Sequence, residues 1–227
     1  MPAPLPPLPR VQRPLAELLD FVRSRTALAP VPLVPEIALY QAHEFTPLWH
    51  ATASDLRAWD DSPFWAFPWA GGQAVARYLL DHPEGVAGRS VLDFGTGSGL
   101  GAIAAARAGA ARTIAWDLDP FCEGAVHLNA AANGVGIEFR AGSPLGLALP
   151  DTDLVIAGDV FYERALAADF LAWGHALAAA GVRVLAGDPG RLYSPPNGLA
   201  VVAEYEVPTT LEIEDRLLMR TWVLDVR

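Results

Sequence analysis

A glycine-rich segment between an apolar run and an alanine-rich run constrains this chain most strongly. The apolar residues 89–94 (RSVLDF) lead into Gly95, Gly97 and Gly99, and an alanine-rich stretch follows over residues 99–109. Glycines at such a turn let the backbone bend tightly and approach a ligand without Cβ clashes. A strand, a glycine loop and a helix in this order predict an α/β protein that binds a ligand at the end of the strand.

The rest of the chain continues this alternation of short apolar runs and amphipathic stretches. Strands that alternate with helices at this spacing indicate a Rossmann-like, mostly parallel sheet with helices on both faces. We predict strands at residues 112–117, 137–141, 153–159, 182–188, 199–207 and 217–226, and helices starting near residues 72 and 121 and spanning residues 164–179.

The length of 227 residues suits one α/β domain with a short appendage. We expect residues 1–35 to form a proline-rich arm followed by a short helix that Pro14 begins. A single domain over residues 36–227 then comprises a substrate-side segment, 36–88, with short β-like runs at 37–50, and a Rossmann-like core, 89–227.

Charge and composition exclude several classes of function. The net charge is −10 and every basic residue is arginine, which argues against a general nucleic-acid binder and favours contact with a basic protein segment. No apolar stretch is long enough to span a bilayer. The histidines show no metal-ligand spacing, and the single cysteine, Cys122, is expected to be buried. We therefore expect no nucleic acid, no membrane and no metal.

Codon economy explains the missing lysine, because alanine, arginine, glycine and proline use GC-rich codons. This composition indicates a GC-rich bacterial genome and a cytoplasmic protein. An alternative is a mitochondrial matrix protein, because arginines near the start resemble a presequence, although Glu17 and Asp20 count against one.

Two details distinguish the glycine loop from a dinucleotide site. The dinucleotide fingerprint would need glycine where the chain has Leu100. The carboxylate of Asp93 precedes the loop, where it would repel a pyrophosphate but attract a cation. This pattern is typical of sites for S-adenosylmethionine, which carries a sulfonium and an α-amino group. We assign cofactor contacts to Asp93, Gly95, Thr96, Gly97 and Gly99.

The other half of the cofactor site is expected after the next strand. Asp117 lies 20 residues after Gly97 and is predicted to bind both ribose hydroxyls; the alternative is a polar turn at the strand end. Leu118 is expected to pack on the adenine ring and Ser143 to lie at its edge, while Asp119 caps the following helix. Trp69, which precedes Ala-Gly-Gly-Gln, is assigned to the cofactor side.

The methyl acceptor is expected beyond the fourth strand of the core, which delivers Asp159, Phe161 and Tyr162 to the ligand edge of the sheet. A lysine acceptor must first lose its proton, which costs about 4–5 kcal/mol at pH 7. Asp159 is predicted to orient the lysine amine or take its proton, and also to lie beside the cofactor. Tyr162 is predicted to contact the cationic form of the lysine. Trp65 and Phe67 line the channel in this interpretation, or pack in the core in the alternative one.

The combination of motifs resembles the electron transfer flavoprotein β-subunit lysine methyltransferase family, within the seven-β-strand methyltransferases. The resemblance covers residues 63–225 and rests on these segments: 63–99 (PFWAFPWAGGQAVARYLLDHPEGVAGRSVLDFGTGSG), 117–120 (DLDP), 128–135 (LNAAANGV), 157–163 (AGDVFYE) and 187–193 (GDPGRLY). It implies a seven-stranded sheet with the last strand antiparallel, S-adenosylmethionine as methyl donor, and lysines of the flavoprotein β subunit as acceptors.

The resemblance also carries roles to individual residues. Asp93, Gly95 and Gly97 match the cofactor loop, Asp117 the ribose ligand, and Trp69 the tryptophan before the loop. Asp159 and Tyr162 match an acid-x-x-aromatic motif used at the acceptor. Arg191 lies in a family loop that we expect to shape the substrate channel together with Phe161. We expect a monomer, and a ribosomal stalk protein is a second possible protein substrate.

Three alternatives remain open from the sequence. The first is a methyltransferase of another acceptor, such as a ribosomal protein or a small pyridine amine, since its cofactor half would look the same. The second is a catalytically silent module that binds the cofactor. The third and most remote is a nucleotide-dependent oxidoreductase.

Overall fold

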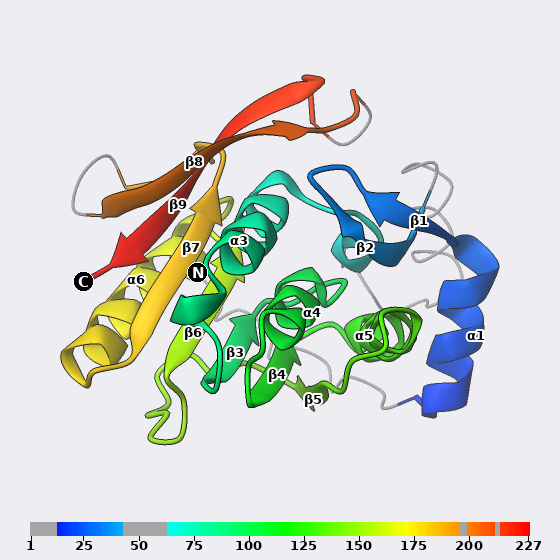
Figure 1. Ribbon diagram of the computed structural model, residues 1–227, viewed down its shortest axis with the longest axis horizontal. Helices are drawn as coiled ribbons and strands as arrows, with labels where there is room; N and C mark the ends of the chain where they lie inside the picture. The colour runs from blue at the N-terminus through cyan, green and yellow to red at the C-terminus, as the bar shows by residue number, and fades with distance from the viewer. Residues whose placement is uncertain (1–12, 43–62, 196–198, 212–213) are drawn as a thin grey trace, which may run out of the picture.

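A computed structural model describes residues 13–42, 63–195, 199–211 and 214–227. The start of the proline-rich arm and most of the β-like stretch predicted at residues 37–50 lie outside these ranges. The described residues form a seven-stranded sheet in the order β5-β4-β3-β6-β7-β9-β8 and a separate two-stranded hairpin, β1-β2 (Figure 1).

The strands of the large sheet lie close to their predicted positions. The first five run parallel, and β9 pairs antiparallel with both β7 and β8. The predicted seven-stranded, mostly parallel sheet with an antiparallel last strand is confirmed. The strands are β3 (Ser90–Phe94), β4 (Arg112–Asp117), β5 (Glu138–Ala141), β6 (Leu154–Gly158), β7 (Arg183–Asp188), β8 (Ala200–Pro208) and β9 (Leu218–Val226).

Helices cover both faces because neighbouring strand residues point in opposite directions. Val91 and Leu154 pack in one apolar cluster with α3 and α4, whereas Leu92 and Val155 pack in another with α6. The α5 helix covers the β5 edge. The helices are α3 (Ala70–Asp81), α4 (Leu100–Arg107), α5 (Phe121–Ala132) and α6 (Arg164–Ala179), with short 3-10 turns η1 (Phe64–Ala66) and η2 (Pro83–Gly85).

Local chemistry explains where these helices start and stop. The carboxylate of Glu163 accepts hydrogen bonds from Ala165 N and Leu166 N at 2.9 Å each, so it caps α6, which spans the predicted residues 164–179. Gly134, with a φ of 66°, follows the end of α5, where a left-handed residue is required. The α3 helix begins at Ala70, two residues before the predicted start, because Trp69 is its N-cap.

The N-terminal segment folds onto α5 at the right of Figure 1. The α1 helix (Leu15–Arg25) buries Leu18 against Gly124 of α5, where a Cβ would lie 2.9 Å from Leu18 atoms. The strands β1 (Ala27–Val31) and β2 (Val34–Gln41) follow as an antiparallel hairpin. The predicted division between residues 35 and 36 thus falls inside β2. The β1 strand was not predicted, because it is short and contains a proline.

Asn129 of α5 and Asn133, the C-cap of this helix, attach the hairpin to the core. Asn129 Oδ1 accepts a hydrogen bond from Tyr40 N at 2.7 Å, and Asn133 Oδ1 accepts one from Ala38 N at 3.1 Å. Asn129 Nδ2 also donates to Ser98 O at 2.8 Å, so one buried side chain joins β2, α5 and the glycine loop. None of the described helices is both long and apolar enough to cross a membrane.

Candidate active site

A cavity of about 390 Å³ lies at the carboxyl ends of β3, β4 and β6. Strand order reverses there, because the chain runs outward from β3 to β5 and returns to β6 on the other side of β3. The cavity brings together most residues assigned to the site from sequence: Trp65, Phe67, Trp69, Asp93, Gly95, Thr96, Gly97, Asp117, Leu118, Ser143, Asp159, Tyr162 and Arg191.

The glycine loop takes a backbone path that only glycine adopts easily. Gly95, Gly97 and Gly99 have φ values of 61°, 52° and 84°. A Cβ at Gly95 would meet nothing within 4 Å, so the loop leaves open space at this point. Gly99 is not among the residues that line the cavity; it is the N-cap of α4 and packs against Val126. Its role is to shape the loop.

Asp93 ties the glycine loop to α4 from below. Its Oδ2 accepts hydrogen bonds from Thr96 Oγ1 at 2.6 Å and from Ala102 N at 2.9 Å. Burial raises the pKa of Asp93 to about 7, although these hydrogen bonds oppose the shift. A cation in the cavity would therefore ionise a carboxyl that is close to half protonated at neutral pH.

Asp117 holds the loop from the side of β4. Its Oδ2 accepts from Gly97 N and its Oδ1 from Asp119 N, both at 2.9 Å. Burial raises the pKa of Asp117, against the effect of these hydrogen bonds. Cys122 lies beside it and is buried as predicted, and burial raises the thiol pKa further.

The adenine-side residues and two indole groups complete this end of the cavity. Leu118 is half-exposed and, like Ser143, lies on the cavity wall. The indole Nε1 atoms of Trp65 and Trp116 are buried and have no hydrogen-bond partner within the described part of the chain. Both tryptophans line the cavity. Acidic groups, open space over Gly95 and unpaired donors fit a ligand that carries positive charge and hydrogen-bond acceptors.

The aromatic segment 64–69 before α3 lies partly in the apolar core and partly at the rim of the cavity. Trp65 and Phe67 are almost fully buried in an apolar cluster with α1 and α5, so both readings of these residues hold in part. Trp69 Nε1 donates to Phe64 O at 2.9 Å. The exposed ring of Phe64 lies 5.7 Å from the ring of Tyr162, which places Phe64 at the channel rim, a residue that sequence reasoning missed.

Asp159 occupies a strained turn directly after β6. Its φ of 56° is positive, which is uncommon for a residue other than glycine. Its backbone N donates to Gly187 O at 2.9 Å, and its Oδ2 accepts from Gly72 N at 3.1 Å. Burial raises the pKa of Asp159 to about 6, against the effect of the nearby Arg191 cation.

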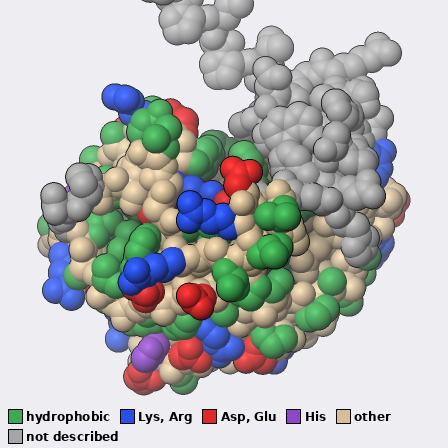
Figure 2. All heavy atoms as spheres, turned by 90° about the horizontal axis from the view of Figure 1, so that it is seen from above, with side chains coloured by type: hydrophobic (Ala, Val, Ile, Leu, Met, Phe, Trp, Pro, Cys, Tyr) green, Lys and Arg blue, Asp and Glu red, His purple; other side chains and the backbone are tan. Residues whose placement is uncertain are grey.

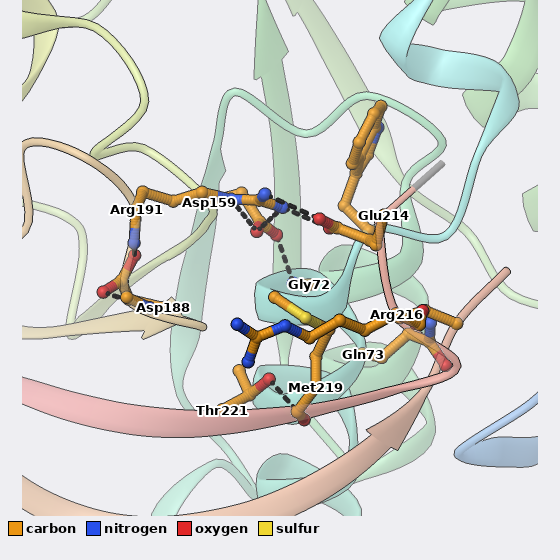
Figure 3. A network of polar contacts seen from close by, with 12 residues as sticks. Gly72, Gln73, Asp159, Asp188, Arg191, Glu214, Arg216, Met219 and Thr221 are labelled. Atoms are coloured by element: carbon orange, nitrogen blue, oxygen red, sulfur yellow. Dashed lines mark hydrogen bonds and ion pairs between the residues drawn. The ribbon is translucent and has the colours of Figure 1, made fainter. Parts of the chain in front are cut away.

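Arg191 lines the cavity and pairs there with Asp159. Its Nε and Nη2 donate to Asp159 Oδ1 at 3.0 and 2.6 Å, and its other contacts go to the carboxylate of Glu214 (Figure 3). Burial would lower the pKa of Arg191, but the two acidic partners raise it on balance. Glu214 was not predicted, because it lies in the connection between β8 and β9 without any motif around it.

Phe161 requires a correction. The sequence placed it in the substrate channel, but its side chain is fully buried and its ring lies 6.0 Å from that of Phe170 in α6. The positive φ at Asp159 turns the chain sharply, so that Tyr162 faces outward, half-exposed, while Phe161 enters the core.

Gly71, Gly158 and Gly187 allow α3 to pack close to Asp159, because a Cβ at any of them would clash with backbone atoms. A Cβ at Gly187 would lie 2.0 Å from Gly71 O, and a Cβ at Gly158 would lie 2.6 Å from Gly72 N. The first turn of α3 therefore packs backbone to backbone against the ends of β6 and β7, which brings Gly72 N to the Asp159 carboxylate. The sequence offered these glycines only as parts of longer motifs.

The chain is similar in sequence to known methyltransferases. The chain is 39% identical over 199 residues to the electron transfer flavoprotein beta subunit lysine methyltransferase of Rattus norvegicus, covering 85% of this chain and 77% of that protein. The ribosomal protein L11 methyltransferase of Methylococcus capsulatus is 49% identical over 70 residues, covering 31% of this chain and 24% of that protein. A family model for ribosomal protein L11 methyltransferase (PrmA) matches residues 79–159.

A solved structure agrees on the fold. The magnesium protoporphyrin IX methyltransferase of Synechocystis, solved with S-adenosylmethionine bound, is similar with a TM-score of 0.50 and 19% identity, covering 69% of this chain and 79% of that one.

Proposed function

The chain belongs to the electron transfer flavoprotein beta subunit lysine methyltransferase family, and from this we propose that it methylates lysine side chains of that flavoprotein subunit. The methyl donor is S-adenosylmethionine. The observation that carries the proposal is one continuous cavity, with Asp117 and the glycine loop in one part and Asp159 and Tyr162 in another.

The residues around the glycine loop suit the proposed cofactor. Asp117 has carboxylate lone pairs left for the ribose hydroxyls after accepting from Gly97 N and Asp119 N. Asp93 supplies negative charge for the α-amino group, and Leu118 supplies apolar surface for the adenine ring. When bound, S-adenosylmethionine would supply a methyl group on a sulfonium. A neutral amine would attack that methyl carbon in line with the carbon–sulfur bond, which breaks and releases S-adenosylhomocysteine.

The residues near Asp159 suit a lysine acceptor. The Phe64, Trp69 and Tyr162 rings surround the approach with aromatic surface, whose low polarity disfavours the ammonium form of the lysine and so favours the neutral amine. Asp159 has a pKa of about 6, so it is ionised at neutral pH and accepts a hydrogen bond from the lysine Nζ. Arg191 donates twice to Asp159 Oδ1, so the acceptor amine is directed to Oδ2, which keeps a lone pair after accepting from Gly72 N.

Methylation of the purified flavoprotein with labelled S-adenosylmethionine tests the proposal. We expect label on lysines of the β subunit, located by mass spectrometry of its peptides. The chain itself contains no lysine, so lysine label cannot arise from self-modification. A β subunit that stays unlabelled, while the protein binds the cofactor, would contradict the proposed substrate.

Ribosomal protein L11 is a second candidate substrate, favoured by the matching family model and by the Methylococcus relative. The family model matches residues 79–159, which include the glycine loop and Asp117, and this cofactor half would look the same for either acceptor. The same assay run on purified L11 separates the two: label on L11 and none on the flavoprotein would support the second candidate.

A further inference from the structure

The connection between β8 and β9 contributes a glutamate to the site. Glu214 Oε2 accepts a hydrogen bond from Arg191 Nη1 at 2.8 Å, and its Oε1 accepts one from Arg191 Nη2. The side chain of Glu214 is only 6% exposed and that of Arg191 18%. Two carboxylates therefore share one guanidinium away from bulk water, an arrangement in which each ionic contact is strong.

Arg191 is held in place from several sides. Asp188 at the end of β7 accepts hydrogen bonds from Gly190 N at 3.0 Å and from Arg191 N at 3.2 Å, which fixes the backbone of the loop. The Trp69 ring lies 5.8 Å from the guanidinium carbon of Arg191. In Figure 3 the Arg191 side chain extends between Asp159 and Glu214. The guanidinium is thus held between Asp159 and Glu214, with Glu214 as its second carboxylate partner.

Asp159 depends on this arginine for its own position and charge. Its two oxygens are held by Arg191 and by Gly72 N, and the charged side chains placed against it within the described residues are Arg191 and Glu214. The α3 and β7 elements present backbone groups to it, Gly72 N and Gly187 O. Losing Arg191 would leave two buried carboxylates facing each other without a cation.

We infer that Glu214 is a positioning residue for the methyl transfer, which acts through Arg191 to hold the Asp159 carboxylate toward the acceptor lysine. Glu214 thereby adds a contact to a site that otherwise comes from the carboxyl ends of β3, β4, β6 and β7 and from the aromatic segment before α3. The inference rests on the proposed function of that site.

The test uses two variants of the full chain and one matched control. Glu214→Gln keeps the shape of the side chain but removes its charge, and Arg191→Met removes the shared cation. Glu204→Gln is the control, because Glu204 in β8 also pairs with an arginine through both oxygens, Arg220 on β9, but on an exposed surface. Cofactor binding by calorimetry and methylation of the flavoprotein are measured for each.

We expect Glu214→Gln to lower kcat by roughly 10-fold or more, because the carboxylate that directs the amine is less well fixed. The dissociation constant of S-adenosylmethionine should stay within about twofold, since Glu214 is not among the residues lining the cofactor cavity. Glu204→Gln should match the parent in both measurements.

The pH profile separates positioning from a general loss of structure. The Glu214 charge raises the pKa of Asp159 and the Arg191 charge lowers it. The acid limb of kcat should therefore move to lower pH in Glu214→Gln and to higher pH in Arg191→Met. Limbs that stay at the parental pH in both variants, or a Glu214→Gln variant as active as the control, would overturn the inference. Failure of the parent protein to methylate the flavoprotein would instead count against the proposed substrate.

Discussion

Asp117 has a double task, since it holds the loop at Gly97 and faces the place proposed for the ribose hydroxyls. We predict that Asp117→Ala weakens binding of S-adenosylmethionine about 100-fold, because two hydrogen bonds to a charged group are lost together. Isothermal titration calorimetry measures the effect. Asp153→Ala is the control, since Asp153 accepts a hydrogen bond from Ser90 N at the start of β3 and does not line the cavity. Equal affinities of the two variants for S-adenosylmethionine would refute the assignment of Asp117.

The raised pKa of Asp93 makes the stability of the folded protein depend on pH. The pKa of an ordinary aspartate, as in the unfolded chain, is 3.8, and that of Asp93 in the folded protein is about 7. At any pH between these two values the folded protein therefore binds more protons than the unfolded chain. Stability then falls as pH rises. We predict that the free energy of unfolding of the parent, relative to Asp93→Asn, drops on the order of 3 kcal/mol between about pH 4 and about pH 8. Urea unfolding of both proteins across this range is the measurement, and a difference that stays constant would contradict the buried carboxyl as its cause.

Backbone contact joins α3 to the strands β6 and β7, and each of these three elements leads into or supplies part of the site. A Cβ at Gly187 would lie 2.0 Å from Gly71 O and 2.8 Å from Val75. We predict that Gly187→Ala lowers the free energy of unfolding by about 3 kcal/mol, because the start of α3 must move, and that it also reduces methylation.

Gly72→Ala, in the first turn of α3, provides the comparison with Gly187→Ala in β7. A Cβ there meets nothing within 4 Å, so this change should stabilise the protein by about 0.5–1 kcal/mol. Thermal and urea unfolding of the two variants measure both effects. If Gly187→Ala were as stable as Gly72→Ala, the close packing of α3 would not be needed.

The protein as a whole carries a net charge of −10, and acidic and basic side chains alternate with apolar ones on the face shown in Figure 2. A lysine-bearing protein substrate is attracted by this charge, and salt screens the attraction. We predict that kcat/KM for the flavoprotein falls several-fold between low salt and about 0.15 M salt, while the affinity for S-adenosylmethionine changes less. Initial rates and calorimetry at matched salt concentrations check this; a salt-independent rate would exclude electrostatic steering.

Local sequence was sufficient to predict the Rossmann-like core and to bring the glycine loop and Asp117 to one cavity. The spacing of apolar residues along the chain predicts the strands and helices. The glycine loop depends only on Gly95, Gly97 and Gly99, which have positive φ. The link from this loop to Asp117 follows from one connection of ordinary length between two parallel strands. These features depend on neighbours along the chain, and one sequence therefore shows them.

Only the tertiary structure decided what surrounds Asp159. Arg191 lies 32 residues away along the chain and Glu214 a further 23, and they meet because β9 inserts between β7 and β8. The burial of Phe161 depends on a turn at Asp159, which Gly187 and Gly72 stabilise from other elements. Local periodicity carries no information about such contacts, because the order of strands in the sheet, rather than the spacing of residues, brings these groups together.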